Sequence, residues 1–268
     1  MSLKNKFAIL KKNIAGMKSV LVAFSGGVDS TFLLKVAADE LRKNCLAVTA
    51  KSETYPAEEL TNSKRIAKNF KVRHLIIRTK ELKNPKFSSN PVNRCYFCKR
   101  ELFGRLKQIA KKNKLNFVID ASNASDVLDF RPGEKAKNEL GVRSPLQEAG
   151  LTKEDIRILS KKLKLATWDK PAQACLASRI PYGTKISSRL LKQVNQGEFF
   201  LRREGFNQVR VRHHDFGLCR IELLKEEFPL FFKISNKIVE KFKGLGYNYV
   251  TLDLAGYRTG SLNEVIKK

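Results

Sequence analysis

The stretch VLVAFSGGVDS, residues 20–30, decides the fold of this chain. Its five apolar residues, 20–24, are too few for a core helix, so they predict a strand that is buried on both faces. The run stops at a Ser-Gly-Gly turn, and a helix is expected from about Asp29, because residues 30–41 place apolar side chains at helical spacing. The stretch therefore predicts a strand, a glycine turn and a helix in direct succession.

This turn predicts an anion-binding site. Gly26 and Gly27 allow the backbone to approach an oxyanion closely, and the end of the helix adds partial positive charge. The hydroxyls of Ser25 and Ser30 are further donors. Asp29 would repel a bare phosphate, so we expect it to cap backbone donors or to meet a Mg²⁺ ion bound to phosphates.

The turn matches neither a Walker A loop nor a GxGxxG loop. It resembles the pyrophosphate loop, SGGxDS, of the ATP pyrophosphatase superfamily. That resemblance implies ATP as cofactor, with residues 25–27, 29 and 30 around the leaving pyrophosphate while a substrate oxygen is adenylated. The alternative is an ordinary strand, turn and helix built from small residues.

The first part of the chain alternates strands and helices. Strands are predicted at 45–50, 72–78 and from 115, and helices at 54–70 and from the CxxC to about Lys112. Apolar strands that alternate with helices indicate an α/β fold with a parallel sheet and helices on both faces. The resemblance makes this a Rossmann-like ATP pyrophosphatase domain.

Ligands of such sheets bind where the strands end. Lys51 ends the second predicted strand, and members of the superfamily use this segment near the nucleotide base. Asp120, Asn123 and Asp126 follow the fourth strand and suit ribose hydroxyls or the water shell of Mg²⁺. They are equally typical of a plain polar turn.

The pattern changes near residue 185, so we expect two domains, 1–185 and a smaller α+β domain at 186–268. Residues 79–92 are predicted to be a polar linker. The stretch 166–186 lacks periodicity, and an irregular loop of that length usually lines a site; it contains Cys175, Ser178 and Arg179.

Three of the five cysteines are candidate metal ligands. Cys95 and Cys98 form a CxxC at a predicted helix start, where two thiolates can share one metal or cluster. With Cys175 they would suit a 4Fe–4S cluster that leaves one iron open; a redox CxxC and a zinc site completed by a histidine are the alternatives. Cys45 and Cys219 are expected in the core.

The chain is strongly basic, with 53 Lys and Arg against 26 Asp and Glu and a formal net charge of +27. This charge favours polyanionic partners, although the lysines are scattered rather than gathered in one block. The lysine-rich residues 1–18 lack a signal-peptide core, and no apolar run is long enough to cross a bilayer. We expect a cytoplasmic protein and a homo-oligomer, with no membrane partner.

Arginines mark the second domain. Arg210 and Arg212 alternate along a predicted strand, so both point to one face and can grip a phosphate or carboxylate; Arg258 can join them. The alternative is a solvated basic face. Glu198, on the preceding helix, is expected to be an ordinary surface carboxylate unless the fold brings it to the site.

Together these segments resemble the LarE sulfur transferases, which build the nickel-pincer cofactor of lactate racemase. The resemblance covers nearly the whole chain and rests on SGGVDS, NRCYFCKREL, DFRPGEKAKNELGVRSPLQEAGLTKEDIR, WDKPAQACLASRIPYGTKI and GYRTGSLNE. It implies that each carboxylate of pyridinium-3,5-biscarboxylic acid mononucleotide is adenylated and that sulfur then replaces AMP.

The resemblance also implies roles for individual residues. Cys175 matches the essential cysteine, which in some members gives up its own sulfur and ends as dehydroalanine. Members with an additional CxxC bind a 4Fe–4S cluster on three cysteines, which implies a cluster on Cys95, Cys98 and Cys175 with sulfide or another sulfur donor. The resemblance further implies that Arg210, Arg212 and Arg258 bind phosphate and that Glu198 is a metal-binding carboxylate. Arg179, which lies in the irregular loop with Cys175, is a further candidate for cofactor binding.

Two other functions fit parts of the sequence. A tRNA thiolase of the same superfamily can carry three cysteines and an open cluster, and the positive charge suits RNA, but no RNA-binding module is evident. A non-enzymatic, metal-binding nucleic-acid module would leave SGGVDS unexplained. We therefore expect a small nucleotide substrate rather than a nucleic-acid partner, although the positive charge does not exclude a nucleic acid.

Overall fold

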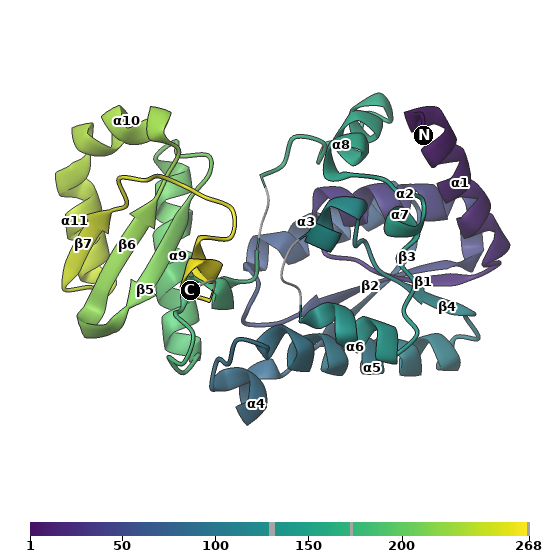
Figure 1. The fold of residues 1–268 in the computed structure, drawn as a ribbon, viewed down its shortest axis with the longest axis horizontal. Coiled ribbons are helices and arrows are strands. Elements are labelled where there is room, and N and C mark those ends of the chain that lie inside the picture. The colour runs from purple at the N-terminus through teal and green to yellow at the C-terminus, as the bar shows by residue number, and fades with distance from the viewer. Residues whose placement is uncertain (129–131, 172–173, 267–268) are drawn as a thin grey trace. The chain divides into compact units, whose positions relative to one another are not determined.

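A computed structural model of the protein describes residues 1–128, 132–171 and 174–266. The chain forms two compact units (Figure 1). The first unit takes residues 1–81 and 93–173, and the second takes 82–92 and 174–268. Within the described residues no helix is long and apolar enough to span a membrane.

The first unit is built on a four-stranded parallel sheet, which confirms the predicted α/β class (Figure 1). Its strands are β1 (Val20–Ala23), β2 (Cys45–Lys51), β3 (Arg73–Arg78) and β4 (Phe117–Ile119). They lie in the order β3-β2-β1-β4. Three β1 residues have less than 1% of their surface exposed, as expected of a central strand covered on both faces.

Successive side chains of β1 point to opposite faces of the sheet, and helices cover both faces. Val20 and Val22 pack in a core with α1, α2, α3, α7 and α8, whereas Leu21 packs with α5. The bounds are α1 (Leu3–Gly16), α2 (Val28–Leu41), α3 (Ala57–Asn69), α5 (Arg94–Lys112), α6 (Gly133–Glu139), α7 (Pro145–Glu148) and α8 (Lys153–Lys162). α6 packs against α5 (Figure 1).

Chain order and strand order together locate the ligand-binding edge. From β1 the chain proceeds to β2 on one side of it, while β4 pairs with its other side. The chain therefore adds β2 and β3 on one side of β1 and β4 on the other, so the order of strand addition reverses between β1 and β4. Open α/β sheets bind ligands at the carboxyl ends of the strands at such a reversal. The SGGVDS loop leaves β1 at this position.

The second unit holds a three-stranded sheet. β5 (Arg210–His214) pairs antiparallel with β6 (Leu218–Glu222), and β6 pairs parallel with β7 (Tyr249–Leu252). Its helices are α9 (Ser188–Arg203), α10 (Phe228–Lys233) and α11 (Ser235–Gly244). Between α10 and α11 the backbone leaves the helical conformation at Ile234 (φ −115°, ψ 20°), so two separate helices form.

The segment predicted to be a polar linker, 79–92, is instead built into the structure. It contains the short helix α4 (Pro85–Ser88), and Asn90 has no exposed surface. The Asn90 amide donates to the carbonyls of Pro181 (2.6 Å) and Thr184 (3.0 Å), and Ile186 N donates to the Ser88 carbonyl (2.8 Å).

These bonds explain why the units divide differently from the predicted domains 1–185 and 186–268. Asn90 ties residues 82–92 to the segment before residue 186, so both segments belong to the second unit. As expected, the described residues of 166–186 form no regular element beyond the 3₁₀ turn η4 (Leu176–Arg179). Residues 172–173 of that stretch and 129–131 of the DFRPGEK motif lie outside the described residues.

Candidate active site

The glycine loop after β1 is held by its own serines. Ser25 Oγ and Ser30 Oγ lie 3.0 Å apart, and Ser30 Oγ also accepts from Ser25 N (3.3 Å) and donates to the Gly27 carbonyl (3.2 Å). Gly27 is the N-cap of α2. Gly26 has a φ of +77°, which side chains disfavour, so a glycine is needed there. The predicted strand, turn and helix are confirmed.

Asp29, in the first turn of α2, is the unusual group of this loop. Its Oδ2 accepts from Asn123 Nδ2 (3.3 Å), while its Oδ1 is buried and has no hydrogen-bond partner among the described residues. Burial raises the pKa of the carboxyl, and the nearby charge of Lys153 opposes this rise. A buried carboxylate oxygen without a partner is costly, so it suits an incoming cation or donor.

Asn123 and Asp126 reach the same edge of the sheet from the loop after β4. Asp126 Oδ2 accepts from Asn123 N (3.0 Å), and Asn123 Oδ1 accepts from Ser125 N (3.0 Å). The carboxylate of Asp126 is also close enough to raise the pKa of Asp29. The fold thus brings three predicted residues, Asp29, Asn123 and Asp126, to one place.

Asp120 does not join them. Its carboxylate accepts from Ser144 Oγ (2.5 Å) and Ser122 Oγ (2.8 Å), and it is buried. The bond from Ser144 ties the end of β4 to the start of α7. Lys51, predicted near the nucleotide base, is the exposed last residue of β2.

The donors around Asp29 fit a Mg²⁺ ion that arrives with phosphates. Protein Mg²⁺ sites typically use one or two carboxylates and complete the shell with water and substrate phosphates. Asp29 and Asp126 supply two carboxylates, and Asp29 Oδ1 lacks a partner among the described residues. In residues 1–128, 132–171 and 174–266 no three His, Cys, Asp or Glu side chains converge into a complete metal site.

Three cations near the loop were not predicted. Lys153 and Arg157, four residues apart on α8, act electrostatically on Asp29. Lys170 Nζ donates to the Gly26 carbonyl (3.2 Å) and to Glu59 Oε2 (2.6 Å). The i, i+4 spacing could have placed the first two on one helix face, but no local signal directs Lys170 to a loop 144 residues earlier in the chain.

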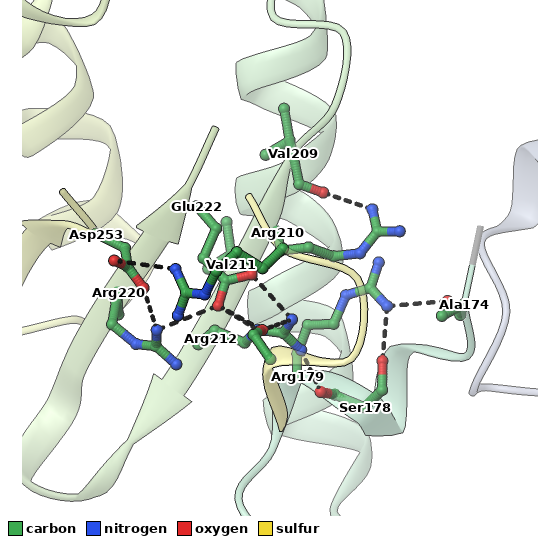
Figure 2. A network of polar contacts seen from close by, with 12 residues as sticks. Ala174, Ser178, Arg179, Val209, Arg210, Val211, Arg212, Arg220, Glu222 and Asp253 are labelled. Atoms are coloured by element: carbon green, nitrogen blue, oxygen red, sulfur yellow. Dashed lines mark hydrogen bonds and ion pairs between the residues drawn. The ribbon is translucent and has the colours of Figure 1, made fainter. Parts of the chain in front are cut away.

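In the second unit the segment that carries Cys175 is held by Arg179 (Figure 2). Arg179 Nη1 donates to the carbonyls of Ala174 (3.0 Å) and Cys175 (3.2 Å) and to Ser178 Oγ (2.9 Å). Its Nε and Nη2 bind the two carboxylate oxygens of Glu198 at 2.6 and 3.0 Å. The guanidinium that was predicted to bind cofactor is therefore engaged by the protein itself.

Glu198 was expected on the surface, but none of its surface is exposed. Besides Arg179, its carboxylate accepts from Arg202 Nη2 (2.6 Å) and from Val211 N (3.2 Å). Burial by itself would raise the pKa of Glu198, but the charge and hydrogen bonds of Arg179, together with the charges of Arg202 and Arg210, outweigh burial and lower it. The expectation of a surface carboxylate is wrong because α9 turns this side chain inward onto β5. Its predicted metal-binding role stays a prediction.

The predicted strand arginines differ in their surroundings (Figure 2). Arg212 binds both oxygens of Glu222 (3.0 and 2.9 Å) and donates to the Ser178 carbonyl (2.6 Å) and Ser261 Oγ (2.7 Å). Arg210 donates to the Val209 carbonyl (2.7 Å), and its guanidinium lies 5.2 Å from the centre of the Tyr257 ring.

Arg210 has the less favourable environment for its charge. Burial and the like charge of Arg179 lower the pKa of Arg210 to about 10. In Arg258, by contrast, a bond to the exposed Glu264 raises the pKa. An anion beside Arg210 would offset the effects of burial and of the Arg179 charge, and would thereby stabilise the charged guanidinium.

Linked ion pairs extend from these residues across the second unit. Five guanidinium groups pair with four carboxylates, and Arg210 lies close enough to Glu198 for the two charges to interact, so the group carries more positive than negative charge, which suits a phosphate. The members are Arg179, Arg202, Arg210, Arg212, Arg220 and Arg258 with Glu198, Glu222, Asp253 and Glu264.

The three candidate cluster ligands are divided between the units. Cys95 is exposed and Cys98 is half-buried, three residues apart in the first turns of α5, so their thiols lie on one helix face. Cys175 is half-buried and directly precedes η4 in the second unit. The paired thiols fit two ligands of a cluster.

The two remaining cysteines lie in the cores, as predicted. Cys45 begins β2 and Cys219 lies in β6, and both are buried. Burial raises the pKa of each thiol to about 12, so neither is a thiolate at neutral pH.

Comparison with known proteins agrees with this geometry. The family model described as queuosine biosynthesis protein QueC matches residues 19–93, which include β1, the glycine loop, β2 and β3. An uncharacterized protein of Synechocystis is 44% identical over 99% of this chain and 100% of its own length. An uncharacterized protein of Methanocaldococcus jannaschii is 30% identical over 96% of this chain and 95% of its own length.

One relative has a named activity. The pyridinium-3,5-bisthiocarboxylic acid mononucleotide synthase of Lactiplantibacillus plantarum is 37% identical over 100% of this chain and 97% of its own length. Both units are therefore shared with that enzyme. With the pyrophosphate loop at the reversal of the sheet, this full-length likeness shows that the chain belongs to the LarE family of ATP-dependent sulfur transferases.

Proposed function

We propose that this enzyme converts the carboxylates of pyridinium-3,5-biscarboxylic acid mononucleotide to thiocarboxylates. A carboxylate oxygen attacks the α-phosphorus of ATP, the bond to pyrophosphate breaks, and an acyl-adenylate forms. A sulfur nucleophile then attacks the acyl carbon and AMP leaves. Activation is required because a carboxylate oxygen is a poor leaving group, whereas AMP is a good one.

The observation that carries the proposal is the position of Asp29 beside the glycine loop. Its Oδ1, which is buried and has no hydrogen-bond partner among the described residues, lies at the edge where parallel sheets bind ligands. The name of the Lactiplantibacillus relative supports the choice of substrate. That name also favours a mononucleotide over tRNA as the sulfur acceptor.

We assign the first unit to the adenylation half of the reaction. Backbone N–H groups at Gly26, Gly27 and the start of α2 would hold the pyrophosphate, with the Ser25 and Ser30 hydroxyls beside them. Asn123 and Lys51 would contact the nucleoside. A Mg²⁺ ion held by Asp29 and Asp126 would neutralise the phosphate charge during displacement.

We assign the second unit to the substrate phosphate and to sulfur delivery. Arg210, Arg212 and Arg258 would bind the phosphate, and Arg179 would set the backbone of Cys175. Cys95, Cys98 and Cys175 would hold a 4Fe–4S cluster, which when bound supplies an iron site open to hydrosulfide.

The test is an anaerobic reaction with ATP, Mg²⁺, sulfide and the biscarboxylic mononucleotide. We expect release of pyrophosphate and AMP and a mass gain in the substrate for each oxygen replaced by sulfur. Asp29→Ala and Ser25→Ala should abolish pyrophosphate release while far-UV circular dichroism stays unchanged. If both variants adenylate the substrate normally, the assignment of the loop is wrong.

A second arm of the experiment distinguishes between the two candidate substrates. Transfer RNA replaces the mononucleotide in an otherwise identical reaction, and thiolated nucleosides are sought after digestion. We expect none. Thiolation of tRNA without any conversion of the mononucleotide would overturn the proposed substrate while leaving the adenylation chemistry in place.

A further inference from the structure

Lys170 makes two contacts that its position in the sequence does not suggest. Its ammonium group donates to the Gly26 carbonyl in the glycine loop and to the carboxylate of Glu59 in the first turn of α3. Both charged side chains are largely buried, with 17% and 13% of their surfaces exposed. A pair so shielded from solvent holds its geometry better than an exposed one.

The backbone that carries Lys170 is itself held firmly. After α8 the chain makes two turns, in which Trp168 N donates to the Leu165 carbonyl and Lys170 N to the Thr167 carbonyl. Arg157 then binds the carbonyls of Trp168 (2.9 Å) and Lys170 (2.8 Å) with one guanidinium. The ammonium group therefore approaches the loop from a fixed base.

The contact with the Gly26 carbonyl determines where the next N–H points. The chain has no cis peptide bonds among its described residues, so the Gly26 C=O and the Gly27 N–H point in opposite directions. Because the carbonyl faces Lys170, the N–H points the other way, into the loop. There its protein partner is Ser25 Oγ at 3.4 Å, a weak contact that an anion can replace.

A peptide between two glycines is easily turned over. Neither residue has a Cβ to block the rotation, and Gly26 already has a φ of +77°. If the peptide flipped, the Gly27 N–H would leave the loop and a carbonyl oxygen would face the phosphate. The loop therefore needs an external contact to hold this peptide in the anion-binding orientation.

We propose that Lys170, paired with Glu59, is a positioning residue that keeps the Gly27 N–H directed at the pyrophosphate of ATP. This inference rests on the proposed role of the glycine loop. In this role Lys170 acts through the peptide and need not touch ATP. Glu59 keeps the ammonium group beside the Gly26 carbonyl instead of releasing it to the phosphates.

Binding of inorganic pyrophosphate with Mg²⁺ tests the proposal. Lys170→Met should weaken pyrophosphate and ATP binding by about tenfold, the effect of losing one hydrogen bond to a charged group, and leave AMP binding unchanged. Lys161→Met is the matched control: it removes a lysine of α8 that lies over the ring of Trp168, and no contact of this lysine with the glycine loop is seen among the described residues. We expect this variant to bind like wild type.

A spectroscopic signal reports the peptide directly. With ¹⁵N-glycine labelling, pyrophosphate should shift the Gly27 amide resonance in wild type but not in Lys170→Met, while the glycines of the second unit keep their resonances. Lys170→Arg retains a donor and should restore the shift at least in part. Unchanged pyrophosphate binding with a normal Gly27 shift in Lys170→Met would overturn the inference.

Glu59→Gln separates positioning from direct contact. If Lys170 positions the peptide, loss of its partner leaves pyrophosphate binding equal to wild type or weaker. Tighter binding would mean that the released ammonium group contacts the phosphates, and it would overturn positioning. Wild type that bound neither ATP nor pyrophosphate would overturn the proposed function itself, whereas a failure confined to the Lys170 variants overturns only this inference.

Discussion

Arg179 and Glu198 form a two-point ion pair inside the second unit, and the same guanidinium holds the carbonyl of Cys175. Only 2% and 0% of their side-chain surfaces are exposed. All three nitrogen atoms of the Arg179 guanidinium thus donate hydrogen bonds. Three of these bonds go to Ala174, Cys175 and Ser178, in the segment that contains the cysteine. The pair connects α9 to η4, and other bonds of the guanidinium reach the residues that precede η4.

The first prediction concerns the cost of breaking this pair. Glu198→Gln keeps the side-chain shape but leaves Arg179 as a buried charge without its carboxylate, so the free energy of unfolding should fall by about 3–5 kcal/mol. Urea unfolding of the full chain measures the change. Glu264→Gln is the control, because its exposed pair with Arg258 should contribute about 0–1 kcal/mol. Equal losses in both variants would contradict this account.

The second prediction is that Asp29 reduces stability at neutral pH. Burial raises the pKa of its carboxyl in the folded chain, whereas in the unfolded chain the value is ordinary, about 3.9. The folded chain is therefore more stable when Asp29 is protonated. This advantage is fully present below about pH 3.9 and is lost as pH rises through the pKa of the folded chain. Asp29→Asn should therefore unfold at higher urea than wild type at pH 7, with no difference near pH 3, and should release no pyrophosphate.

Asp39→Asn is the control for that experiment. It changes the same residue type in the same helix, but Asp39 is exposed and paired with Lys35 (2.6 Å). No gain in stability at pH 7 is expected from it. A loss of stability at pH 7 in Asp29→Asn would show that the buried carboxylate has a stabilising partner, contrary to the prediction.

The third prediction separates two arginines of β5. Arg212→Met should lower the free energy of unfolding by about 3 kcal/mol, because it removes the two-point partner of the fully buried Glu222. Arg210→Met should cause no loss at pH 7, since burial and Arg179 already disfavour its charge and lower its pKa to about 10. Thermal and urea unfolding of both variants provide the comparison.

Inorganic phosphate extends this test to binding. In wild type, phosphate should raise the thermal unfolding midpoint, because an anion beside Arg210 offsets the unfavourable charge. Arg210→Met should lose this increase while retaining the fold. If Arg210→Met and wild type were stabilised equally by phosphate, Arg210 would not be part of the phosphate site.

The fourth prediction concerns sulfur. If Cys95, Cys98 and Cys175 hold one cluster, a serine at any of the three positions should stop sulfur transfer while pyrophosphate release survives. Wild type prepared without oxygen should contain iron and sulfide and should turn over repeatedly with added sulfide. Mass spectrometry of the protein after turnover is the decisive measurement. Stoichiometric dehydroalanine at position 175, with full activity in Cys95→Ser/Cys98→Ser, would support a sacrificial cysteine instead.

Local sequence was sufficient to predict the structure at the centre of the first unit. The apolar run 20–24, the glycines after it and the periodic residues 30–41 act within a few positions of one another, so they predict strand, turn and helix directly. Strand–helix alternation then predicts the parallel sheet, and a parallel sheet brings strand ends together. Asp29 and Asn123 could be expected to meet for that reason, although 94 residues separate them.

Tertiary structure decided which charged groups are engaged and which are exposed. The sequence shows that Glu198 lies on a helix, but only the packing of α9 on β5 buries it against Arg179. Likewise, the alternation of Arg210 and Arg212 predicts one shared face, whereas the structure gives them different surroundings: Arg212 binds Glu222 of β6, and Arg210 lies against the ring of Tyr257. Lys170 contacts Gly26 because Arg157 fixes the turn that follows α8 and carries Lys170. Such contacts join residues far apart in the chain, and no local periodicity encodes them; they arise when the packed core sets the distances between elements.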